Sequence, residues 1–504
     1  MKRMHKFLPL LLIIFSLPIM WGIFHPGFFV SDDGHWMIIR LSAFYEALTS
    51  GQFPVRFLPR LNEGLGYPVA DFLYPLFLYV GSLLHILRIP FVLDVKIILG
   101  VSVITSGVGM YIFLKKNFSS FASFFGGLLF MYLPYHLYDL FNRGSVGEIV
   151  SLGVVPFLFW AIEKKSWTLS SIFLGLLILA HNSLAIFFFP VAVMYAYVGK
   201  MSIRHIVLFS GFGLGLAAFF WIPALFDKQF TIFDTVIVSN PFNYFVNTVS
   251  YQLAGWIMLA IFGGIFFTKK PFKEKSLLFF IILGISSLFL SFSISSIFWK
   301  SKVLAEFVQF PFRFLSLTLL CESFLGAYLV EHFKQKIILT SVLSLLLVFS
   351  SLPYLFPTKY DYQNDSFYAT NAATTTVQNE YMPRWLVHIP TAYMYQKIVL
   401  PKEVGSITIT QQKGTALRFA SDTNRDSNVV IAFAYFPGWF ATIDGRKVSL
   451  APSNTGMLQL RVPKGHHVVH IWFGETWQRV FADIASILSV ALIVLFLIKK
   501  RYEK

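Results

Sequence analysis

Long apolar segments recur along almost the whole chain, and they constrain its fold more than any other feature. A helix needs about 20 residues to cross the hydrocarbon core of a bilayer, and shorter segments serve where protein buries them. Twelve segments fit this description: 7–24, 92–114, 119–134, 147–162, 168–180, 184–199, 204–222, 250–268, 276–293, 311–331, 336–353 and 479–498. Charged residues make up only 13% of the 504 residues, against about 25% in soluble domains. A polytopic membrane protein is expected, and a soluble enzyme, a nucleic-acid binder and a disordered scaffold are excluded.

Basic clusters between the apolar segments predict the orientation of the chain. Lysine and arginine outnumber the acidic residues, 41 to 25, and such residues collect in cytoplasmic loops. If each of the twelve segments crosses once, every cluster from Lys115-Lys116 to 499–501 lies on the side of the N-terminus. We therefore predict twelve spans, a retained first helix, and cytoplasmic N- and C-termini. The apolar stretch 70–88 breaks the pattern and is predicted to lie along the outer interface or to re-enter; a crossing there would make thirteen spans.

The tract between the last two apolar segments has a different, more polar composition. Apolar and polar residues alternate over 406–410 and 429–434, as is typical of half-buried strands. Asp444-Gly445 between two β-like runs indicates a hairpin. We predict a small antiparallel β-sandwich here. The predicted organisation is a mostly α-helical transmembrane domain at 1–356 with a long outer loop at 25–91, an extracytoplasmic β-rich domain at 357–476, and a final transmembrane helix with a basic cytoplasmic tail at 477–504.

Aromatic residues in this tract have two interpretations. Tyr435, Phe436 and Trp439 are able to stack on sugar rings, but packing inside the sandwich or against the membrane is the simpler account. The stretch 379–385, which precedes the predicted strands, is a candidate lid over an outer cavity.

An acidic pair, Asp32-Asp33, follows the first apolar segment. Ionisable residues at a membrane are costly, which makes them candidate functional groups. The apolar spacing from Trp36 to Leu48 predicts an amphipathic helix, so one of the two carboxylates could instead cap its start. Two caps at one helix start explain the pair less well, and at least one aspartate is a candidate catalytic residue.

Other ionisable residues on the predicted outer side are candidates for binding an anionic substrate. Arg143 and Glu148 flank the start of a span and could form a structural bridge, or Arg143 could clamp a phosphate with its fixed fork of donors. His181-Asn182 lies between two spans, where a lone histidine is commonly just buried and hydrogen-bonded. Arg313 begins a span, and snorkelling to the interface is the alternative to ligand binding.

These residues together predict one site on the outer face. The predicted catalytic pair is Asp32 and Asp33, and the predicted substrate- or phosphate-binding residues are His35, Arg40, Arg56, Arg143, Glu148, His181, Asn182 and Arg313. A carboxylate base beside cationic groups suits transfer from a phosphate-activated lipid donor. The base takes the proton of an acceptor hydroxyl, and the cations stabilise the departing phosphate.

The same motifs resemble those of a known group of bacterial membrane proteins. They comprise Asp32-Asp33-Gly34-His35, 51–56, 64–68, 72–75, Arg143-Gly144, His181-Asn182, 310–313, 379–383, 435–439 and 463–467. Over nearly its whole length the chain resembles the YfhO-type proteins and those labelled as related to 6-pyruvoyl-tetrahydropterin synthase. These in turn resemble the GT-C glycosyltransferases, multi-span enzymes that use polyprenyl-phosphate sugars.

The resemblance implies a membrane glycosyltransferase in the bacterial cell membrane, with an inverting transfer on the outer face and one aspartate as general base. The implied partners are membrane lipids, a polyprenyl-phosphate-linked sugar donor, and an envelope glycan, lipid or protein acceptor, without nucleic acid. No cofactor is obligatory, and a divalent metal ion held by Asp32, Asp33 and His35 is the alternative. Pterin chemistry is not implied, because the sequence shows no multi-histidine zinc cluster. The single cysteine, Cys321, excludes a disulfide within the chain.

Two other classes of function stay open. A transporter or flippase for a lipid-linked saccharide would carry ionisable residues near the midplane and broken helices at matching positions of two halves. The charges here gather at one predicted face and no two-half symmetry is evident, which favours the enzyme. The third class is a non-catalytic envelope-assembly protein whose β-rich domain binds a glycan or a partner.

Overall fold

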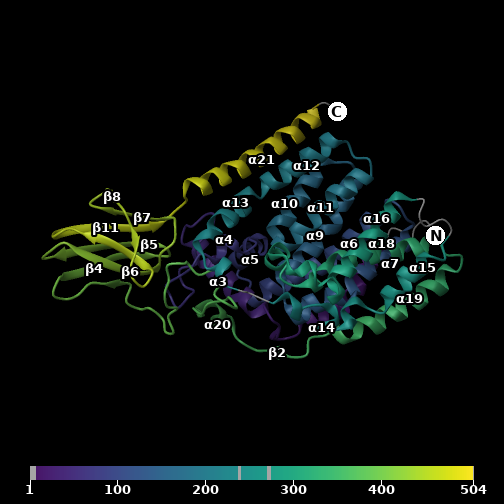
Figure 1. Ribbon diagram of the computed structural model, residues 1–504, viewed down its shortest axis with the longest axis horizontal. Helices are drawn as coiled ribbons and strands as arrows, with labels where there is room; N and C mark the ends of the chain where they lie inside the picture. Colours follow the sequence, from purple (N-terminus) through teal and green to yellow (C-terminus); the bar gives the residue numbers. More distant parts are fainter. Residues whose placement is uncertain (1–6, 237–239, 269–273, 503–504) are drawn as a thin grey trace.

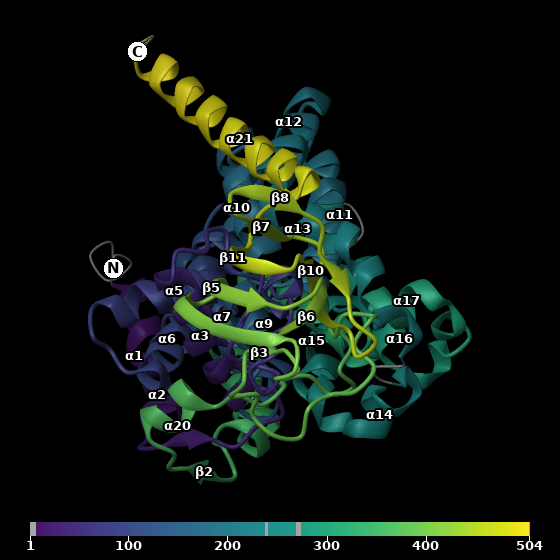
Figure 2. The ribbon, with the colours of Figure 1, turned by 90° about the vertical axis from the view of Figure 1, so that its left-hand side faces the viewer.

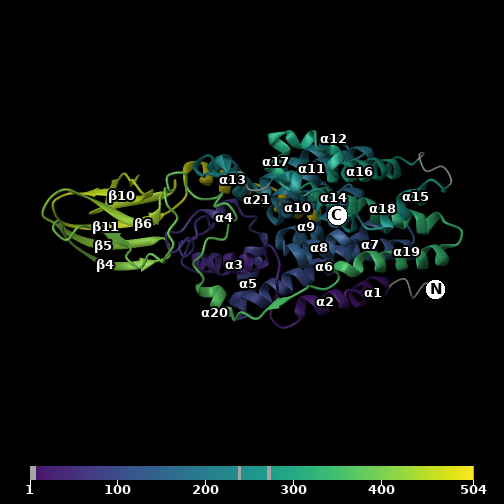
Figure 3. The same ribbon diagram turned by 60° about the horizontal axis from the view of Figure 1, so that its bottom comes forward.

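The computed structural model describes residues 7–236, 240–268 and 274–502, which form a mostly helical body with β-sheets at one end (Figure 1). The strands near the C-terminus project from this body, and Figure 2 views them from their own end. The last helix then runs back along the helical body. Figure 3 shows the first two helices lying toward the end opposite the strands.

Each of the predicted apolar segments contains one or more helices, and further short helices lie between them. In chain order they are α1 (Leu8–Phe15), α2 (Leu17–Phe24), α3 (Gly34–Thr49), α4 (Val69–Phe72), α5 (Leu76–Ile86), α6 (Phe91–Leu114), α7 (Ser120–Tyr132), α8 (Pro134–Tyr138), α9 (Val146–Glu163), α10 (Trp167–Ala180), α11 (Asn182–Val198), α12 (Ile203–Leu216), α13 (Ala218–Asp227), α14 (Val246–Val249), α15 (Ile257–Ile265), α16 (Lys275–Ser291), α17 (Lys302–Phe307), α18 (Leu315–His332), α19 (Lys336–Ser351), α20 (Asp365–Thr370) and α21 (Trp477–Tyr502). Two short helical segments matter below: the π-helical turn η2 (Asp139–Arg143) and the 3₁₀ turn η9 (Pro311–Phe314).

Five helical segments among the described residues are long and apolar enough to cross a membrane. They are α6, α9, α18 with the turn η9 before it, α19 with the turn after it, and α21. A sixth forms if α12 and α13, bent by 70° at their junction, make one broken span. Several other predicted spans hold apolar helices of 10–17 residues, among them α10, α11 and α16. The chain thus has the apolar helices of a membrane protein, whereas the number of spans and their orientation stay predictions.

The stretch 70–88, which breaks the charge pattern, contains only α4 and α5. The eleven residues of α5 span about 16 Å at 1.5 Å per residue, roughly half the hydrocarbon thickness of a bilayer. This helix is therefore too short to cross by itself, as expected for a re-entrant or interfacial segment. Its place relative to the membrane stays a prediction.

Helix α6 lies between α7 and α9 in the apolar core. A Cβ added at Gly107 of α6 would lie 2.5 Å from the sulfur of Met131 in α7, and one at Gly153 of α9 would lie 2.8 Å from Oγ1 of Thr105 in α6. The missing side chains let these helices approach closely, as small residues do between membrane helices. Close packing here fixes α9, which carries Glu148 of the site at its start.

Two antiparallel sheets form the β-region. One has the order β3 (Ile398–Val399), β6 (Ser427–Ala434), β10 (Met457–Val462), β9 (Ala451–Pro452), and the other the order β4 (Gly405–Lys413), β5 (Ala416–Thr423), β11 (Gly465–Phe473), β7 (Trp439–Ile443), β8 (Arg446–Val448). Buried side chains from both sheets share one apolar cluster. The strands predicted at 406–410 and 429–434 are confirmed as β4 and β6.

The predicted hairpin at Asp444-Gly445 is also confirmed. These two residues connect β7 to β8 and have φ angles of 50° and 79°. Positive φ at both central residues is what a two-residue type I′ turn requires, and Asp-Gly meets it at low cost. Phe436 and Trp439 are buried in the core of the sheets, so the packing interpretation holds for them.

The stretch 357–397, predicted as part of the β-rich domain, has contacts on both sides: its first part lies against the helical body, and Val387 and Lys397 hydrogen-bond to Thr455 and Ala432 of the β-region. Its strand β2 (Tyr360–Asp361) pairs with β1 (Phe28–Phe29) of the first outer loop. Further along, the backbone N–H of Glu63 donates to the carbonyl of Ala372, and that of Met394 to the carbonyl of Glu63. This stretch therefore packs on the loop that carries the acidic pair.

Candidate functional site

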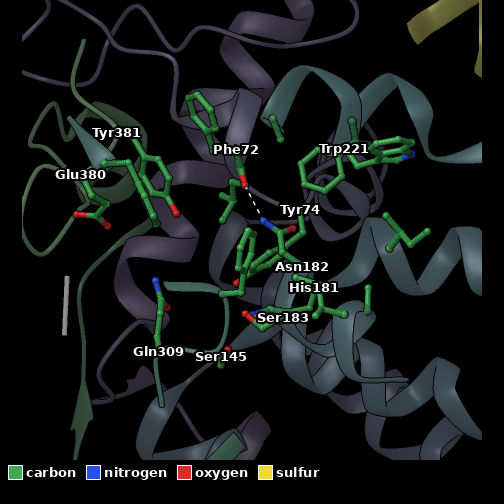
Figure 4. A pocket seen from close by; sticks show the side chains of 18 of the residues that line it. Phe72, Tyr74, Ser145, His181, Asn182, Ser183, Trp221, Gln309, Glu380 and Tyr381 are labelled. Atoms are coloured by element: carbon green, nitrogen blue, oxygen red, sulfur yellow. Dashed lines mark hydrogen bonds between the residues drawn. The ribbon is translucent and has the colours of Figure 1, made fainter. Parts of the chain in front are cut away.

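A cavity of about 420 Å³ lies where segments far apart in the sequence meet (Figure 4). Its wall comes from the start of α3, the chain at 72–74, the α10–α11 junction, α13, and the stretches 307–313 and 376–381. Five of the ten predicted site residues line it: Asp33, Arg40, His181, Asn182 and Arg313. Apolar side chains make up most of the remaining wall. An apolar pocket with a few convergent polar groups is the form that ligand sites usually take.

The two aspartates of the acidic pair have different positions. Asp33 lines the cavity, whereas Asp32 is not among the lining residues. Asp33 is the N-cap residue of α3, yet its side chain makes no capping hydrogen bond, and no described residue donates to either carboxylate. Partial burial raises the pKa of Asp32, Arg143 opposes this rise, and Asp33 adds to it. The capping interpretation is therefore wrong for Asp33, whose carboxylate stays available to a ligand.

Backbone hydrogen bonds hold the acidic pair against η2. The N–H of Asp32 donates to the carbonyl of Asn142 (3.0 Å), and the N–H of Asp33 to that of Arg143 (2.9 Å). Gly144 follows with a φ of 62°, and a Cβ there would lie 2.3 Å from Oγ of Ser31. Only glycine allows the left-handed turn and this close approach together. The motif Arg143-Gly144 thus sets the position of Asp33.

A buried network of charges lies behind the cavity wall. Oε1 of Glu148 accepts from Nη1 of Arg143 at 2.6 Å and from Nε of Arg313 at 2.8 Å. Nη1 of Arg143 also contacts Oδ1 of Asp139 at 2.6 Å. All four side chains are almost fully buried. Buried charges persist only where they are paired and hydrogen-bonded, so the structural-bridge interpretation of Arg143 and Glu148 is confirmed, and neither residue lines the cavity.

Arg313 connects this network to the cavity. It lines the cavity, and its Nη1 donates to the carbonyl of Val308 at 2.8 Å. The guanidinium carbons of Arg313 and Arg143 lie 4.6 Å and 5.3 Å from the ring centroid of Phe310. Stacking and pairing hold the guanidinium of Arg313 in one orientation, with its positive charge facing the cavity.

His181 and Asn182 lie at the α10–α11 junction and face the cavity in Figure 4. Nδ1 of His181 accepts the backbone N–H of Leu184, as the N-cap of α11. The ring proton therefore sits on Nε2, which lies 3.8 Å from Oε1 of Glu148. The amide Nδ2 of Asn182 donates to the carbonyl of Phe72 at 3.1 Å. Hydrogen bonds thus fix the orientation of both residues.

Arg40 holds the stretch that covers one side of the cavity. Its Nε donates to Oγ1 of Thr375 at 2.8 Å, and its Nη2 donates to the carbonyl of the same residue. The hydroxyl of Tyr67 also bonds Oγ1 of Thr375. From the following stretch, Thr376, Val377, Glu380 and Tyr381 line the cavity, so part of the predicted lid, 379–385, forms its wall. Sequence reasoning missed Thr376 and Gln309, because no motif or charge marks them.

Arg56 and His35 lie away from the cavity. The guanidinium of Arg56 contacts Asp71 (3.3 Å), Glu475 (3.3 Å) and Asp483 (3.0 Å), and it joins the first outer loop to the start of α21. Nδ1 of His35 is 2.7 Å from the hydroxyl of Tyr368, and burial lowers the pKa of His35. Neither residue is among those that line the cavity.

The sequence allows metal binding by Asp32, Asp33 and His35 as an alternative. In the part of the chain that the structure describes, no group of three or more histidine, cysteine or acidic side chains is placed to hold a metal ion. The polar side chains that line the cavity carry two carboxylates, two guanidinium groups, an ammonium group, an imidazole, amides and hydroxyls.

The chain was compared with known families, curated proteins and solved structures. No family model matches, and no curated protein matches. Among solved structures, the arabinofuranosyltransferase AftD from Mycobacteria aligns over 71% of this chain and 27% of its own, with 14% identity and a TM-score of 0.49. The oligosaccharyltransferase AglB from Archaeoglobus fulgidus, in complex with an inhibitory peptide and a dolichol-phosphate, aligns over 74% of this chain and 56% of its own, with 11% identity and a TM-score of 0.45.

A second structure of the Archaeoglobus fulgidus oligosaccharyltransferase, tethered to an acceptor peptide, gives 11% identity over 75% of this chain and 60% of its own, with a TM-score of 0.43. This chain thus spans about a quarter of the first protein and less than two thirds of the second. All of these likenesses are weak, with TM-scores below 0.5. The resemblance to YfhO-type proteins stays a prediction.

Proposed function

We propose that this chain is a GT-C-type membrane glycosyltransferase that transfers a sugar from a polyprenyl-phosphate donor to a hydroxyl acceptor. One observation carries the proposal: Asp33, a carboxylate with no partner among the described residues, lines the same cavity as the fixed guanidinium of Arg313. A free base and a held cation in one apolar pocket are the two groups that such a transfer needs. The sequence resemblance points to the same chemistry.

The apolar part of the cavity suits the lipid of the donor. It is lined by Ile178, Ile186 and Phe189 from α10 and α11, and by Trp221 and Leu225 from α13. Ile186 is 46% exposed and Leu225 is 57% exposed, so this wall reaches the outer surface of the helical body. A polyprenyl chain lying there would bury apolar surface at about 25 cal/mol per Å². The phosphate at its end would then meet Arg313.

The proposed reaction is a single displacement. The acceptor hydroxyl attacks C1 of the donor sugar while the carboxylate of Asp33 takes its proton. The bond between C1 and the phosphate oxygen breaks, and its electron pair leaves with the polyprenyl phosphate. Arg313 stabilises the charge that develops on that phosphate. Attack from the side opposite the leaving group inverts the configuration at C1.

Asp33 is the proposed base rather than Asp32, because Asp33 lines the cavity. Asp32 is the preceding residue of the loop and is not among the residues that line the cavity. The proposed roles of Arg143 and Glu148 are structural, since both lie behind the wall and hold Arg313. Arg56 has no proposed part in binding the donor.

The test begins with the purified full-length protein in lipid nanodiscs. Mass spectrometry of co-bound lipid identifies the donor, and the isolated donor then serves for turnover, read as release of polyprenyl phosphate. Removing a general base costs about 10²–10⁴-fold, so Asp33→Asn lowers kcat at least 100-fold while Asp32→Asn has a smaller effect. Asp422→Asn, an exposed residue of β5, is the matched control and keeps wild-type turnover.

Three outcomes would overturn the proposal. If the Asp33→Asn variant retains turnover, Asp33 is excluded as the general base. Movement of an intact lipid-linked saccharide between leaflets without transfer would favour a flippase. Binding of neither a polyprenyl phosphate nor its sugar would favour a non-catalytic assembly protein.

A further inference from the structure

We propose that residues 376–381 form the acceptor subsite, and that the acceptor is an uncharged polyhydroxyl compound, a sugar or a polyol. The inference rests on the proposed function and goes beyond it, because it assigns the acceptor a wall of the cavity and a chemical class. Two unpaired polar groups on that wall carry it: the hydroxyl of Thr376 and one carboxylate oxygen of Glu380.

The wall is fixed before any ligand binds. The hydrogen bonds of Arg40 and Tyr67 to Thr375 anchor its beginning. Its end is anchored by the backbone N–H of Ile232, which donates to the carbonyl of Met382 at 3.0 Å. Between these points the ring of Tyr381 stacks on Phe72, with centroids 5.4 Å apart and planes at 11°. A wall held at both ends presents its polar atoms in a defined geometry, and this lowers the entropy cost of binding.

Two polar side chains on this wall lack the partners that buried groups normally have. Thr376 is 7% exposed, and its Oγ1 has no hydrogen-bond partner among the described residues. Glu380 is 6% exposed, and its Oε2 accepts the N–H of Gln378 at 3.0 Å. Its other oxygen has no partner in the described part of the chain. Leaving the buried hydroxyl of Thr376 unpaired costs free energy, and a ligand in the cavity that both residues line would supply a bond to it and to the free oxygen of Glu380.

The chemistry of these groups selects hydroxyls. A carboxylate only accepts hydrogen bonds, whereas a threonine hydroxyl both donates and accepts. A compound with neighbouring hydroxyl groups can donate to Glu380 and to Asp33 and still exchange a bond with Thr376. A peptide serine or threonine has one hydroxyl and could not serve all of these groups. The aromatic side chains of Tyr381 and Trp36 also line the cavity, and such rings suit the apolar face of a sugar ring.

The charges around the cavity favour a neutral acceptor. Its lining has two carboxylates, Asp33 and Glu380, against three cationic side chains, Arg40, Lys228 and Arg313. The three cationic side chains would repel a cationic acceptor. An anionic acceptor would compete with the donor phosphate for Arg313. In Figure 4, Glu380 and Tyr381 lie on one side and His181, Asn182 and Ser183 on the other.

The experiment uses the tryptophans of the cavity as reporters. Trp36 and Trp221 line it, so titrating the full-length protein in nanodiscs with ribitol, methyl glucoside or methyl N-acetylglucosaminide should change the intrinsic fluorescence. A serine-containing tripeptide is the competing probe. Undecaprenyl phosphate is titrated separately, because its binding tests the proposed function without involving the acceptor.

The variants are isosteric. Glu380→Gln and Thr376→Val are each expected to weaken binding of the polyhydroxyl probe at least fivefold, and to change the affinity for undecaprenyl phosphate less than twofold. Glu403→Gln and Thr408→Val, both exposed in the β-region, are the matched controls and bind both probes like the wild type. Circular dichroism and thermal melts report whether each variant is folded.

Each outcome is decisive. Saturable binding of a sugar or polyol that weakens in both variants supports the acceptor subsite. The assignment of the acceptor subsite is overturned if the tripeptide binds and no sugar or polyol does, or if both variants bind the sugar as tightly as the wild type. It is also overturned if the protein binds undecaprenyl phosphate but none of the acceptor probes. A wild-type protein that fails to bind undecaprenyl phosphate contradicts the proposed function instead, whatever the sugar titration shows.

Discussion

Nε of Arg313 lies 2.8 Å from Oε1 of Glu148, although 165 residues separate the two in the sequence. The pair joins the start of α9 to η9, and both side chains are buried. Glu148 makes no contact with the cavity, but it holds the guanidinium that does. The position of a cation at the proposed phosphate site therefore depends on a carboxylate behind the wall.

Replacing Glu148 with glutamine is expected to destabilise the protein strongly. The change removes one negative charge and leaves Arg143 and Arg313 with Asp139 as the remaining acid of the network. Breaking a buried ion pair from one side costs about 3–5 kcal/mol, because a charge is left uncompensated. Thermal unfolding in detergent measures the effect, with Glu403→Gln as the exposed control. Equal melting temperatures for the wild type and the Glu148 variant would contradict this account of the network.

Arg313→Lys tests whether the guanidinium is needed as well as the charge. Lysine keeps the positive charge but loses the planar fork and the Nε that contacts Glu148. Hydrogen bonds to charged groups contribute about 1.5–3 kcal/mol, so the affinity for undecaprenyl phosphate should fall about tenfold or more. Titration of the lipid phosphate by microscale thermophoresis measures it. The control is Arg446→Lys at an exposed position of β8, and an unchanged affinity in the Arg313 variant would exclude this residue as a phosphate ligand.

Much of the fold follows from local signals in the sequence. The apolar segments predicted helices, and the Asp444-Gly445 turn fixed one hairpin because few other residue pairs accept positive φ at both positions. The motif Asp32-Asp33 marked the cavity, since two carboxylates beside an apolar segment have few structural uses. These features depend on neighbours in the sequence, which is why they could be recognised.

The rest of the site depends on contacts between distant segments. Thr376 carries no charge and belongs to no motif, and the anchoring of Thr375 by Arg40 and Tyr67 brings it to the cavity. Arg56 is the opposite case, a predicted substrate-binding residue that has a structural role. It lies in the first outer loop among other charged residues, but its partners Glu475 and Asp483 come from the far end of the chain. No periodicity or spacing encodes such pairings, so composition cannot separate a binding arginine from a structural one.

Arg56→Met is expected to weaken the connection between the first outer loop and α21. The variant leaves Asp71, Glu475 and Asp483 near one another with Arg479 as the remaining cation of the cluster. Removing one partner of a buried ionic cluster costs about 3–5 kcal/mol, and limited proteolysis at the start of α21 should become faster. Arg461→Met in an exposed pair with Asp426 serves as the control and should show no change. Wild-type proteolysis in the Arg56 variant would show that the cluster is not needed at this junction.

The exposed pair of Asp444 and His467 predicts a pH-dependent stability of the β-region. Oδ2 of Asp444 lies 2.6 Å from Nδ1 of His467. The hydrogen bond raises the pKa of His467 above its ordinary value of 6.5. The same bond, with that from the N–H of Val468, lowers the pKa of Asp444 below 3.8. The histidine contribution is complete below pH 6.5 and is lost as the pH rises through the raised pKa. The aspartate contribution is complete above pH 3.8 and is lost as the pH falls through the lowered pKa.

The stabilisation from this pair is therefore largest between about pH 4 and 6.5. Asp444→Asn removes the charge but keeps an oxygen for the N–H of Val468 and a residue that favours the type I′ turn. Hydrogen exchange of the β7–β8 hairpin should be faster in the variant at pH 5.5, and the difference from the wild type should shrink by pH 9. The histidine pKa, followed by NMR, should return toward 6.5 in the variant. A difference in exchange that is equal at both pH values would instead assign the effect to the turn, because a change in backbone geometry does not titrate.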